Sequence, residues 1–413
     1  MKRLPVLSVL CAAVGLVLVW SATTSAQPAS RQVSAAGAAG SQTFTVNVDG
    51  RNAANESFLA YFPRSTTIHP GDTVVFHYVG VGEPHTVTFG TLADSAIKAF
   101  ASLTPKELQA QTPPKSFLAV DSLLPNLFPQ GPGDVVQSAA NPCYMASGTP
   151  GAALCPASQH EQPAFDGTQS YYNSGWLDSG QKWTMHLSSS TSPGTYRFFC
   201  LLHREDMAGK IDVAPSSKTI MSPAAQFALG QKQLASAEKP LAGPDAALVR
   251  GKAPVPNVTL PGTNPVLAGS GAQNSSGSID QFGPKAVHIP VGGTVTWWMI
   301  GPHTVTFNSD KSDDDIRATA PDGTVHFNTK ALLPANSPGE PTPGKPAFTS
   351  GIHFKLVASK VWNGVGFLNS GIFSNSFGPP VIEGYSIKFT RAGTYHYICT
   401  VHDRMKGTVV VGG

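Results

Sequence analysis

The stretch YHYICTVHDRMKGTVVV (residues 395–411) decides the fold, because it joins two strand-like segments through one short polar turn. A similar stretch, YRFFCLLHREDMAGKIDV (196–213), occurs in the first half of the chain. Runs of β-branched and aromatic residues on both sides of a short turn predict two neighbouring strands. Each turn carries a thiol, an imidazole and a thioether, which belong to Cys200, His203 and Met207 in the first copy and to Cys399, His402 and Met405 in the second.

These two stretches belong to a longer internal repeat. HPGDTVVFHYVGVGEPHTVTF (69–89) aligns with PVGGTVTWWMIGPHTVTF (290–307), and YNSGWLDSG (172–180) aligns with LNSGIFSNS (368–376). The blocks follow one another in the same order in both halves, which is the signature of a duplicated structural unit. Short strands separated by Gly and Pro turns indicate a Greek-key β-sandwich in each half. We therefore predict an all-β protein with two tandem sandwich domains and long, partly helical insertions.

The order of the blocks also predicts the domain boundaries. We expect a signal peptide at 1–26, a first domain at 42–214 with an insertion at 91–170, a linker at 215–255, and a second domain at 256–413 with an insertion at 308–366. In the linker, Ser222 is predicted to cap a helix that begins with Pro223 and stops at Pro240. The Pro-rich run KAPVPNVTLPGTNP (252–265) is predicted to be extended.

Both insertions are too long for plain loops of a sandwich. The first contains TLADSAIKAFASL (91–103) and TPKELQAQ (104–111), which are predicted to form short helices. The second contains the acidic run SDKSDDD (309–315), which lacks the glycine and the distal glutamate of a calcium loop and is predicted to be solvated. Either insertion could cover one end of its sandwich or form the contact between the domains.

The composition and the N-terminal residues indicate where in or outside the cell the protein is located. The chain has 413 residues, of which only 13% are charged, and its formal net charge is +3, so nothing indicates a nucleic-acid partner. The first residues, MKR followed by LPVLSVLCAAVGLVLVW and SATTSA, have the order of a secretory signal. We expect an exported protein, located in the periplasm, outside the cell or at its surface, with a membrane contact only if this segment is not cleaved.

Two of the five cysteines are predicted to form a disulfide. Cys143 and Cys155 lie close together in NPCYMASGTPGAALCPA, and an exported protein most simply pairs such cysteines. Cys11 lies in the predicted signal segment. This leaves Cys200 and Cys399, one in each turn, without an assigned partner.

The residue types in the two turns are those that bind copper. Two imidazoles and one thiolate in a plane, with a weak axial thioether, form the blue-copper electron-transfer site. The repeat supplies the second imidazole of each site through His85 and His303, both in PHTVTF. The predicted metal ligands are therefore His85, Cys200, His203 and Met207 in one site and His303, Cys399, His402 and Met405 in the other. Zinc would accept the Cys and His ligands but would gain little from the Met.

With these residues in place, both halves resemble cupredoxin domains, the family of plastocyanin and azurin. The resemblance covers the β core of each half and omits the insertions and the linker. The spacing in CLLH and CTVH is similar to that of plastocyanin, and HREDM and HDRM both fall within the range that the family uses. The resemblance implies two type 1 copper sites, with His203 and His402 near the surface and a redox partner protein docking beside one of them.

Three classes of function remain open at this stage. The leading hypothesis is an electron carrier without enzymatic activity, because a cage of four protein ligands leaves no position for substrate. A multicopper oxidase or a nitrite-reductase-like enzyme would need an additional copper site, and the chain contains no His-x-His pair. An unconventional site would have to use other histidines, which are His69, His77, His160, His326, His353 and His396. A copper carrier that does not transfer electrons would use the same ligands as the electron carrier.

Overall fold

Buried and partly exposed side chains alternate along strands of the first half, so that one face of each strand packs on a core. In β5 (Thr73–Tyr78), Val74, Phe76 and Tyr78 are fully buried while the residues between them are partly exposed, as expected for a strand with one face on a core.

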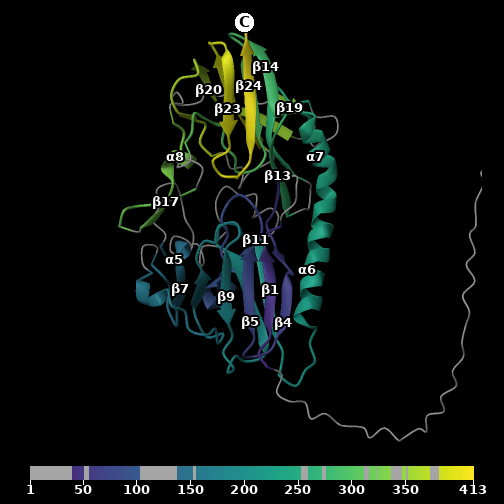
Figure 1. The fold of residues 1–413 in the computed structure, drawn as a ribbon, viewed down its shortest axis with the longest axis vertical. Coiled ribbons are helices and arrows are strands. Elements are labelled where there is room, and N and C mark those ends of the chain that lie inside the picture. The colour runs from purple at the N-terminus through teal and green to yellow at the C-terminus, as the bar shows by residue number, and fades with distance from the viewer. Residues whose placement is uncertain are drawn as a thin grey trace, which may run out of the picture. The chain divides into compact units, whose positions relative to one another are not determined.

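The computed structural model describes residues 40–50, 55–102, 137–151, 155–252, 259–271, 276–310, 316–322, 324–335, 347–349, 352–372 and 381–413. Figure 1 shows these parts in colour.

The first half packs one sheet against another. One sheet has the order β3-β1-β5-β9 and contains β1 (Thr43–Val48), β3 (Tyr61–Phe62) and β9 (Lys182–His186) beside β5. The other has the order β4-β11-β10-β6-β8-β7 and contains β4 (Ser65–Ile68), β6 (Thr88–Phe89), β7 (Pro142–Met145), β8 (Tyr171–Ser174), β10 (Gly194–Cys200) and β11 (Arg204–Val213). Strands β10 and β11 pair antiparallel through a short turn, as predicted. Cys200 is the last residue of β10 and His203 lies in the turn, whereas Met207, which was expected in the turn, lies in β11.

The second half repeats this arrangement. One sheet has the order β14-β24-β23-β16-β21 and contains β14 (Ala286–Pro290), β16 (Thr306–Phe307), β21 (Leu368–Asn369), β23 (Gly393–Ile398) and β24 (Lys406–Gly412). The other has the order β19-β20-β22-β15-β12-β13-β2 and contains β12 (Pro265–Gly271), β13 (Gly277–Gly283), β15 (Thr294–Met299), β19 (Ala347–Thr349), β20 (Ile352–Trp362) and β22 (Val381–Phe389). The prediction of an all-β protein built from two-sheet sandwiches is confirmed.

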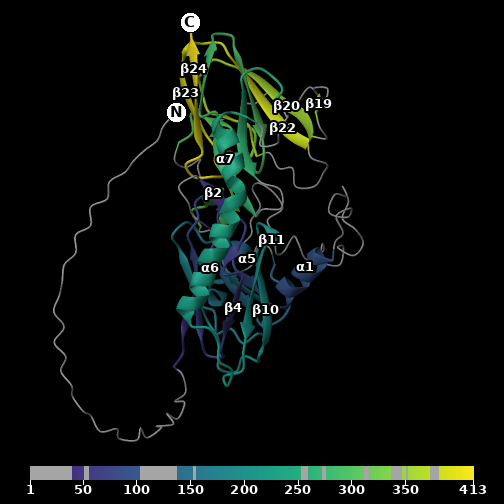
Figure 2. The same ribbon diagram turned by 90° about the vertical axis from the view of Figure 1, so that its right-hand side faces the viewer.

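Strand β2 (Glu56–Phe58) belongs in sequence to the first half but pairs with the second. It lies antiparallel to β13, with Ser57 opposite Ser278, and Figure 2 places its label just below α7. Phe58 is fully buried in an apolar cluster to which both halves contribute, Ile279 and Trp298 among them. Residues Ser41–Gly413 form one compact unit, so the boundaries of two separable domains stay a prediction.

A helical segment connects the halves. Helix α6 (Pro223–Glu238) begins as predicted, with Ser222 as its N-cap and Pro at the first turn. Helix α6 ends at Glu238, just before the predicted stop at Pro240. Helical structure nevertheless continues, because a short 3-10 helix (Lys239–Leu241) leads directly into α7 (Ala242–Val249), which was not predicted. Proline is tolerated in the first turn of a helix, where its missing N–H costs no hydrogen bond. Helix α6 contacts β1 and β3, whereas α7 contacts β12 and β13.

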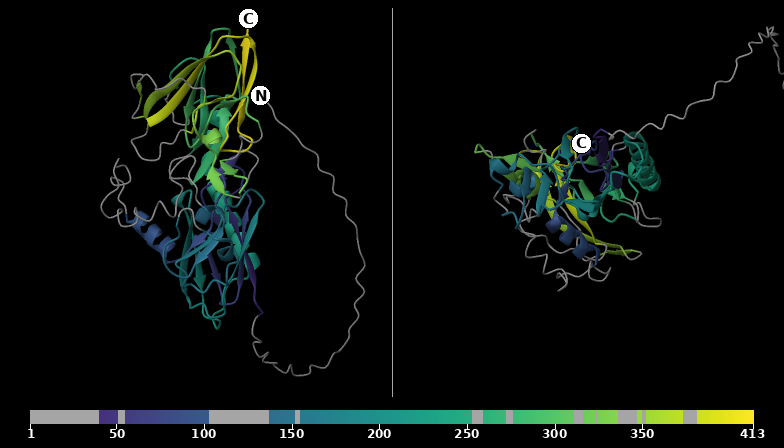
Figure 3. Two further views of the ribbon diagram at one scale, coloured as in Figure 1. Left: turned by 90° about the vertical axis from the view of Figure 1, so that its left-hand side faces the viewer. Right: turned by 90° about the horizontal axis from the view of Figure 1, so that it is seen from below.

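The insertions contribute both to their own sandwich and to the contact between halves. Helix α1 (Thr91–Ala101) confirms the first predicted helix and packs on β10 (Figure 2), and α5 (Gln137–Ala140) precedes β7. In the second insertion, β17 (Arg317–Thr319) pairs with β18 (Val325–Phe327), and α8 (Thr329–Leu332) follows. The side chain of Gln137 donates a hydrogen bond to the carbonyl of Val325. Figure 3 gives two further views of both sets of strands.

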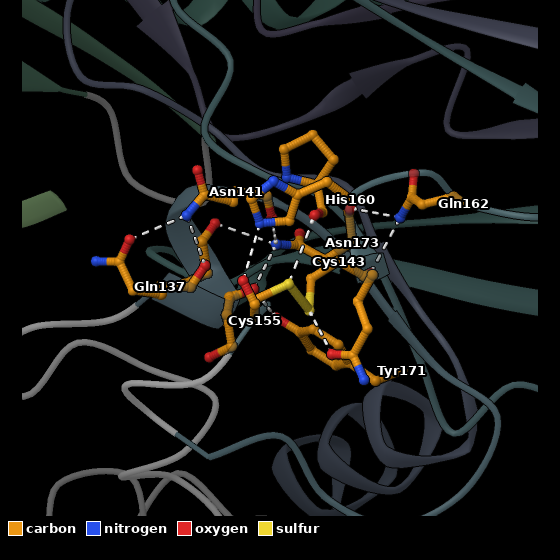
Figure 4. The surroundings of a disulfide bond; sticks show 12 residues. Gln137, Asn141, Cys143, Cys155, His160, Gln162, Tyr171 and Asn173 are labelled. Carbon is orange, nitrogen blue, oxygen red and sulfur yellow. Dashed lines mark hydrogen bonds between the residues drawn. A yellow bond between two sulfur atoms is a disulfide. The ribbon is translucent and has the colours of Figure 1, made fainter. Parts of the chain in front are cut away.

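The predicted disulfide is present between Cys143 and Cys155. Figure 4 shows it beside the amide of Asn173, which donates to the carbonyls of Ser138 and Ala139. The bond therefore fastens part of the first insertion next to β8. A short 3-10 helix (Ala157–Gln159) follows Cys155.

Several predictions lie outside the described residues. They concern the signal peptide, the helix at 104–111 and the residues 311–315 of the acidic run. Among the described residues, none of the helices has both the length and the hydropathy that a membrane span requires.

Candidate metal centres

The second half brings three potential metal ligands together in its interior. His303 precedes β16, Cys399 follows β23 directly, and His402 lies in the turn before β24. The Nδ1 atoms of the two imidazoles lie 3.1 Å apart, and the Sγ atom of Cys399 lies 3.9 Å from His303 Nδ1 and 3.6 Å from His402 Nδ1. All three side chains are buried. We call this group site 2.

The first half contains the equivalent group, which we call site 1. The Nδ1 atoms of His85 and His203 lie 3.1 Å apart, and Cys200 Sγ lies 3.8 Å from His85 Nδ1. The three ligand atoms all lie within 4.8 Å of one another. The repeat in the sequence therefore corresponds to a repeat of side-chain geometry, with the same atoms facing the same centre.

Hydrogen bonds from PHTVTF hold the cysteine turn in the same way in both halves. The backbone N–H of Thr86 points at Cys200 Sγ, and that of Thr304 at Cys399 Sγ, both at 3.4 Å. The Thr86 hydroxyl accepts from the N–H of Leu201 at 2.8 Å, and the Thr304 hydroxyl accepts from the residue after Cys399 at 2.9 Å. Each threonine thus connects the strand of one histidine to the turn that carries the cysteine.

The asparagine of each NSG block also helps to hold the PHTVTF strand in place. Thr88 donates to the side-chain oxygen of Asn173 at 2.8 Å, and Thr306 donates to that of Asn369 at 3.1 Å. The Asn369 amide donates in turn to the carbonyl of Ala331, in the second insertion. The repeated blocks of the sequence therefore form one hydrogen-bonded layer behind each site.

Electrostatics favour the thiolate form of both cysteines. Burial alone would raise the pKa of Cys200, but the imidazoles of His203 and His85 bring it well below its usual range. Burial likewise opposes the shift at Cys399, whose pKa the imidazoles of His303 and His402 lower well below the usual range. A thiolate is the form of cysteine that binds metal.

The donor atoms fit a shared metal ion. In zinc sites the metal lies about 2.0–2.1 Å from nitrogen and about 2.3 Å from sulfur, so a nitrogen and a sulfur that bind one ion are at most roughly 4.4 Å apart. The nitrogen-to-nitrogen and sulfur-to-nitrogen distances given above, 3.1 to 3.9 Å, fall below this limit. Two imidazole nitrogens that face each other beside a thiolate form a soft, anionic donor set, which is the type that copper prefers.

The predicted axial ligands are buried methionines. Met207 and Met405 are buried in the same apolar clusters as Cys200 and Cys399, respectively. The N–H of Cys399 donates to the carbonyl of Met405 at 2.9 Å, which keeps this part of the turn closed. A role of either thioether as a metal ligand stays a prediction.

Carboxyl groups lie near the outer nitrogens of three of the four histidines, and the sequence analysis did not identify them. Asp49 Oδ2 lies 3.4 Å from His85 Nε2, Glu83 Oε1 lies 2.7 Å from His203 Nε2, and Asp280 Oδ1 lies 3.8 Å from His402 Nε2. The available signal was the position of Glu83 two residues before His85. Outer partners of this kind fix the ring orientation and raise the basicity of a metal-binding histidine.

The charges of Glu83 and His402 reinforce each other, whereas burial disfavours the charge of Asp49. Burial alone would raise the pKa of Glu83, but His203 and His402 bring it well below its usual range. Burial lowers the pKa of His402, yet Asp280 and Cys399 outweigh this effect and raise that pKa to about 10. The pKa of Asp49 is raised, because its burial outweighs the hydrogen bond with His85.

The expected surface position of the downstream histidines is wrong for His402. Its side chain is only 3% exposed, and that of His203 is only 11% exposed. The reason is that Glu83, from the first half, lies beside both imidazoles. A partner protein docking near either residue therefore stays a prediction without structural support.

The other histidines have ordinary surroundings where they are described. His69 Nε2 pairs with the carbonyl of Lys218, His160 Nε2 pairs with that of Cys155, and His396 pairs with the Thr408 hydroxyl. Sites 1 and 2 are the groups of three potential ligands found in the part of the chain that the structure describes. The side chain of His353 lies outside that part.

Comparison with known proteins identifies cupredoxins among solved structures. A dithionite-reduced auracyanin from the photosynthetic bacterium Roseiflexus castenholzii is similar at 19% identity and a TM-score of 0.23, over 43% of this chain and 99% of that one. Auracyanin B is similar at 15% identity and a TM-score of 0.21, over 42% and 89% of the two chains. A reduced Cu(I) form of an amicyanin mutant is similar at 20% identity and a TM-score of 0.16, over 37% and 86%. No protein-family model and no curated protein matches the chain.

Proposed function

We propose that the chain is an exported copper-binding electron-transfer protein that holds one copper ion in each of its two sites. The observation that carries this proposal is the paired geometry of His85, Cys200 and His203 and of its counterpart in the second half. Both groups combine a buried free cysteine with two imidazoles whose Nδ1 atoms converge. Such a ligand set belongs to one-electron carriers.

The residues of the chain have separate tasks in this function. The cysteine and histidines bind the metal, and the predicted axial ligands are Met207 and Met405. Bound copper would supply a one-electron change between its cuprous and cupric states. The hydrogen bonds from Thr86 and Thr304 hold each cysteine in one position, and the surrounding apolar cores exclude water. The proposal includes no catalytic copper centre.

The proposal is tested on the purified protein loaded with copper. We expect two copper ions per chain, with the absorption and paramagnetic resonance of blue copper. Cys200→Ser and Cys399→Ser should each remove one ion and about half of the blue absorption, because the thiolate produces that absorption band. His396→Asn, which alters an exposed histidine on β23, is the control and should retain both ions.

Two results would contradict the proposal. If the wild-type protein retains no copper, the ligand assignment is wrong. If a further copper without the blue spectrum binds to the double variant of Cys200 and Cys399, the protein has an open site and should be assayed as an oxidase or reductase.

The N-terminal sequence of the protein recovered outside the cytoplasm tests the proposed export and cleavage after Ala26.

A further inference from the structure

One carboxyl group lies close to a histidine of each metal site. Glu83 Oε1 lies 2.7 Å from Nε2 of His203, in site 1, and 4.0 Å from Nε2 of His402, in site 2. Both distances are measured from the same oxygen atom. The distance between the two Nε2 atoms therefore cannot exceed the sum of these two distances. The Glu83 side chain is 15% exposed, which places this contact largely away from solvent.

The chain between β5 and His85 is shaped to bring Glu83 to this position. The hydroxyl of Tyr78 donates to the carbonyl of Glu83 at 2.9 Å. Gly82 has φ +128°, and a Cβ atom there would lie 3.3 Å from Cδ2 of His402. This backbone therefore passes directly over an imidazole of the other half, an approach that only glycine permits without strain.

Strand pairing between the halves also reaches the surroundings of His402. Ser57, in β2, donates to Asp280, in β13, and β2 pairs with β13 in one ladder. Asp280 in turn lies beside His402. The ladder therefore holds a strand of the first half against the strand that carries Asp280, next to the histidine that Glu83 approaches.

The two sites differ in what surrounds their outer nitrogens. In site 1, both imidazoles face carboxyl groups, Asp49 at 3.4 Å and Glu83 at 2.7 Å. In site 2, His303 Nε2 pairs with a neutral group, the carbonyl of Ile300, at 3.0 Å. His402 has carboxylates only at 3.8 and 4.0 Å, beyond hydrogen-bonding distance. Site 1 therefore has the closer negative charge.

We propose that Glu83 couples the two sites and that the unequal carboxylate contacts give site 1 the lower reduction potential, so that one electron taken up by the protein resides on site 2. This inference rests on the proposed function. A carboxylate that accepts from a metal-binding histidine makes that histidine a stronger donor and stabilises the more positive metal. Net charge and hydrogen bonds around a redox centre set its potential in the same way. Glu83 acts as a positioning residue, since it touches ligands rather than metal.

The first experiment needs no variant of Glu83. The fully oxidised protein with two copper ions receives one electron equivalent from a chemical reductant, which is oxidised as one cupric ion becomes cuprous. Cys200→Ser and Cys399→Ser proteins supply the reference spectra of the single sites. We expect the remaining blue spectrum to match the site 1 reference, with a preference for reducing site 2 of at least about tenfold, or 59 mV for a one-electron couple.

The second experiment tests the role of Glu83. Glu83→Gln should reduce the preference between the sites several-fold, because it removes a charge that lies 2.7 Å from one ligand and 4.0 Å from the other. Asp178→Asn is the matched control. It removes a carboxylate that bridges the halves through Arg317 but contacts no metal ligand, and it should leave the preference unchanged.

The outcomes separate this inference from the proposed function. Two bound blue coppers with an even distribution of the electron, or with the electron on site 1, would overturn the inference alone. The role of Glu83 fails if Glu83→Gln and Asp178→Asn have equal effects. The titration of wild-type protein decides the order of the potentials even if Glu83→Gln does not fold. Loss of all copper binding in wild-type protein would instead overturn the proposed function.

Discussion

Single residues of the PHTVTF blocks hold the candidate metal ligands in place, and Thr304 is the clearest case. Its fully buried hydroxyl accepts from the N–H of Thr400 at 2.9 Å and lies 3.1 Å from the hydroxyl of Thr306. Thr304→Val would leave this buried N–H without an acceptor, at a cost of about 1–3 kcal/mol in the free energy of unfolding. Urea unfolding of the metal-free protein measures the loss. Thr394→Val, at an exposed position of β23, should change the stability by less than about 0.5 kcal/mol, and an equal loss in both variants would contradict this role.

At the scale of elements, α6 packs on the first half so closely that glycine is required at Gly230. A Cβ atom there would lie 2.6 Å from the nitrogen of Pro63. Alanine in a helix normally stabilises it by about 0.5–1 kcal/mol relative to glycine, but Gly230→Ala should destabilise the protein by about 1–3 kcal/mol, because the helix must move away. Gly243→Ala, in α7, has nothing within 4 Å of the added atom and should be neutral or stabilising. Thermal denaturation of both variants checks this, and a stabilising Gly230→Ala would show that the contact is not tight.

At the scale of the whole molecule, the halves share structure and should unfold together. Strand β2 completes a sheet of the second half, Trp176 stacks on Phe327, and one apolar cluster draws side chains from both halves. We expect the metal-free protein to unfold in a single calorimetric transition, with equal calorimetric and van 't Hoff enthalpies. Two resolved transitions would mean that the halves are independent domains, as the boundaries at 42–214 and 256–413 imply.

Local patterns were sufficient to predict the strands and to group the histidines and cysteines that the structure brings together. Alternation in TVVFHY predicts β5 because a strand has a period of two residues, and Ser222 followed by Pro223 predicts the start of α6 because both satisfy the first turn of a helix. The ligands could be grouped because the same residue types recur at the same spacing in both halves. A duplicated pattern restricts the arrangement more strongly than either copy does alone.

The sequence by itself therefore determined the two β-sandwiches, the disulfide and the two groups of histidine and cysteine that converge in them. Only the tertiary structure decided that β2 crosses into the second half, that helical structure continues past Pro240, and that His402 is buried beside Glu83. The physical reason is that periodicity and spacing report interactions within a segment. The contact of Glu83 with His402, by contrast, depends on how two folded surfaces pack, to which residues far apart in sequence contribute without any shared local pattern.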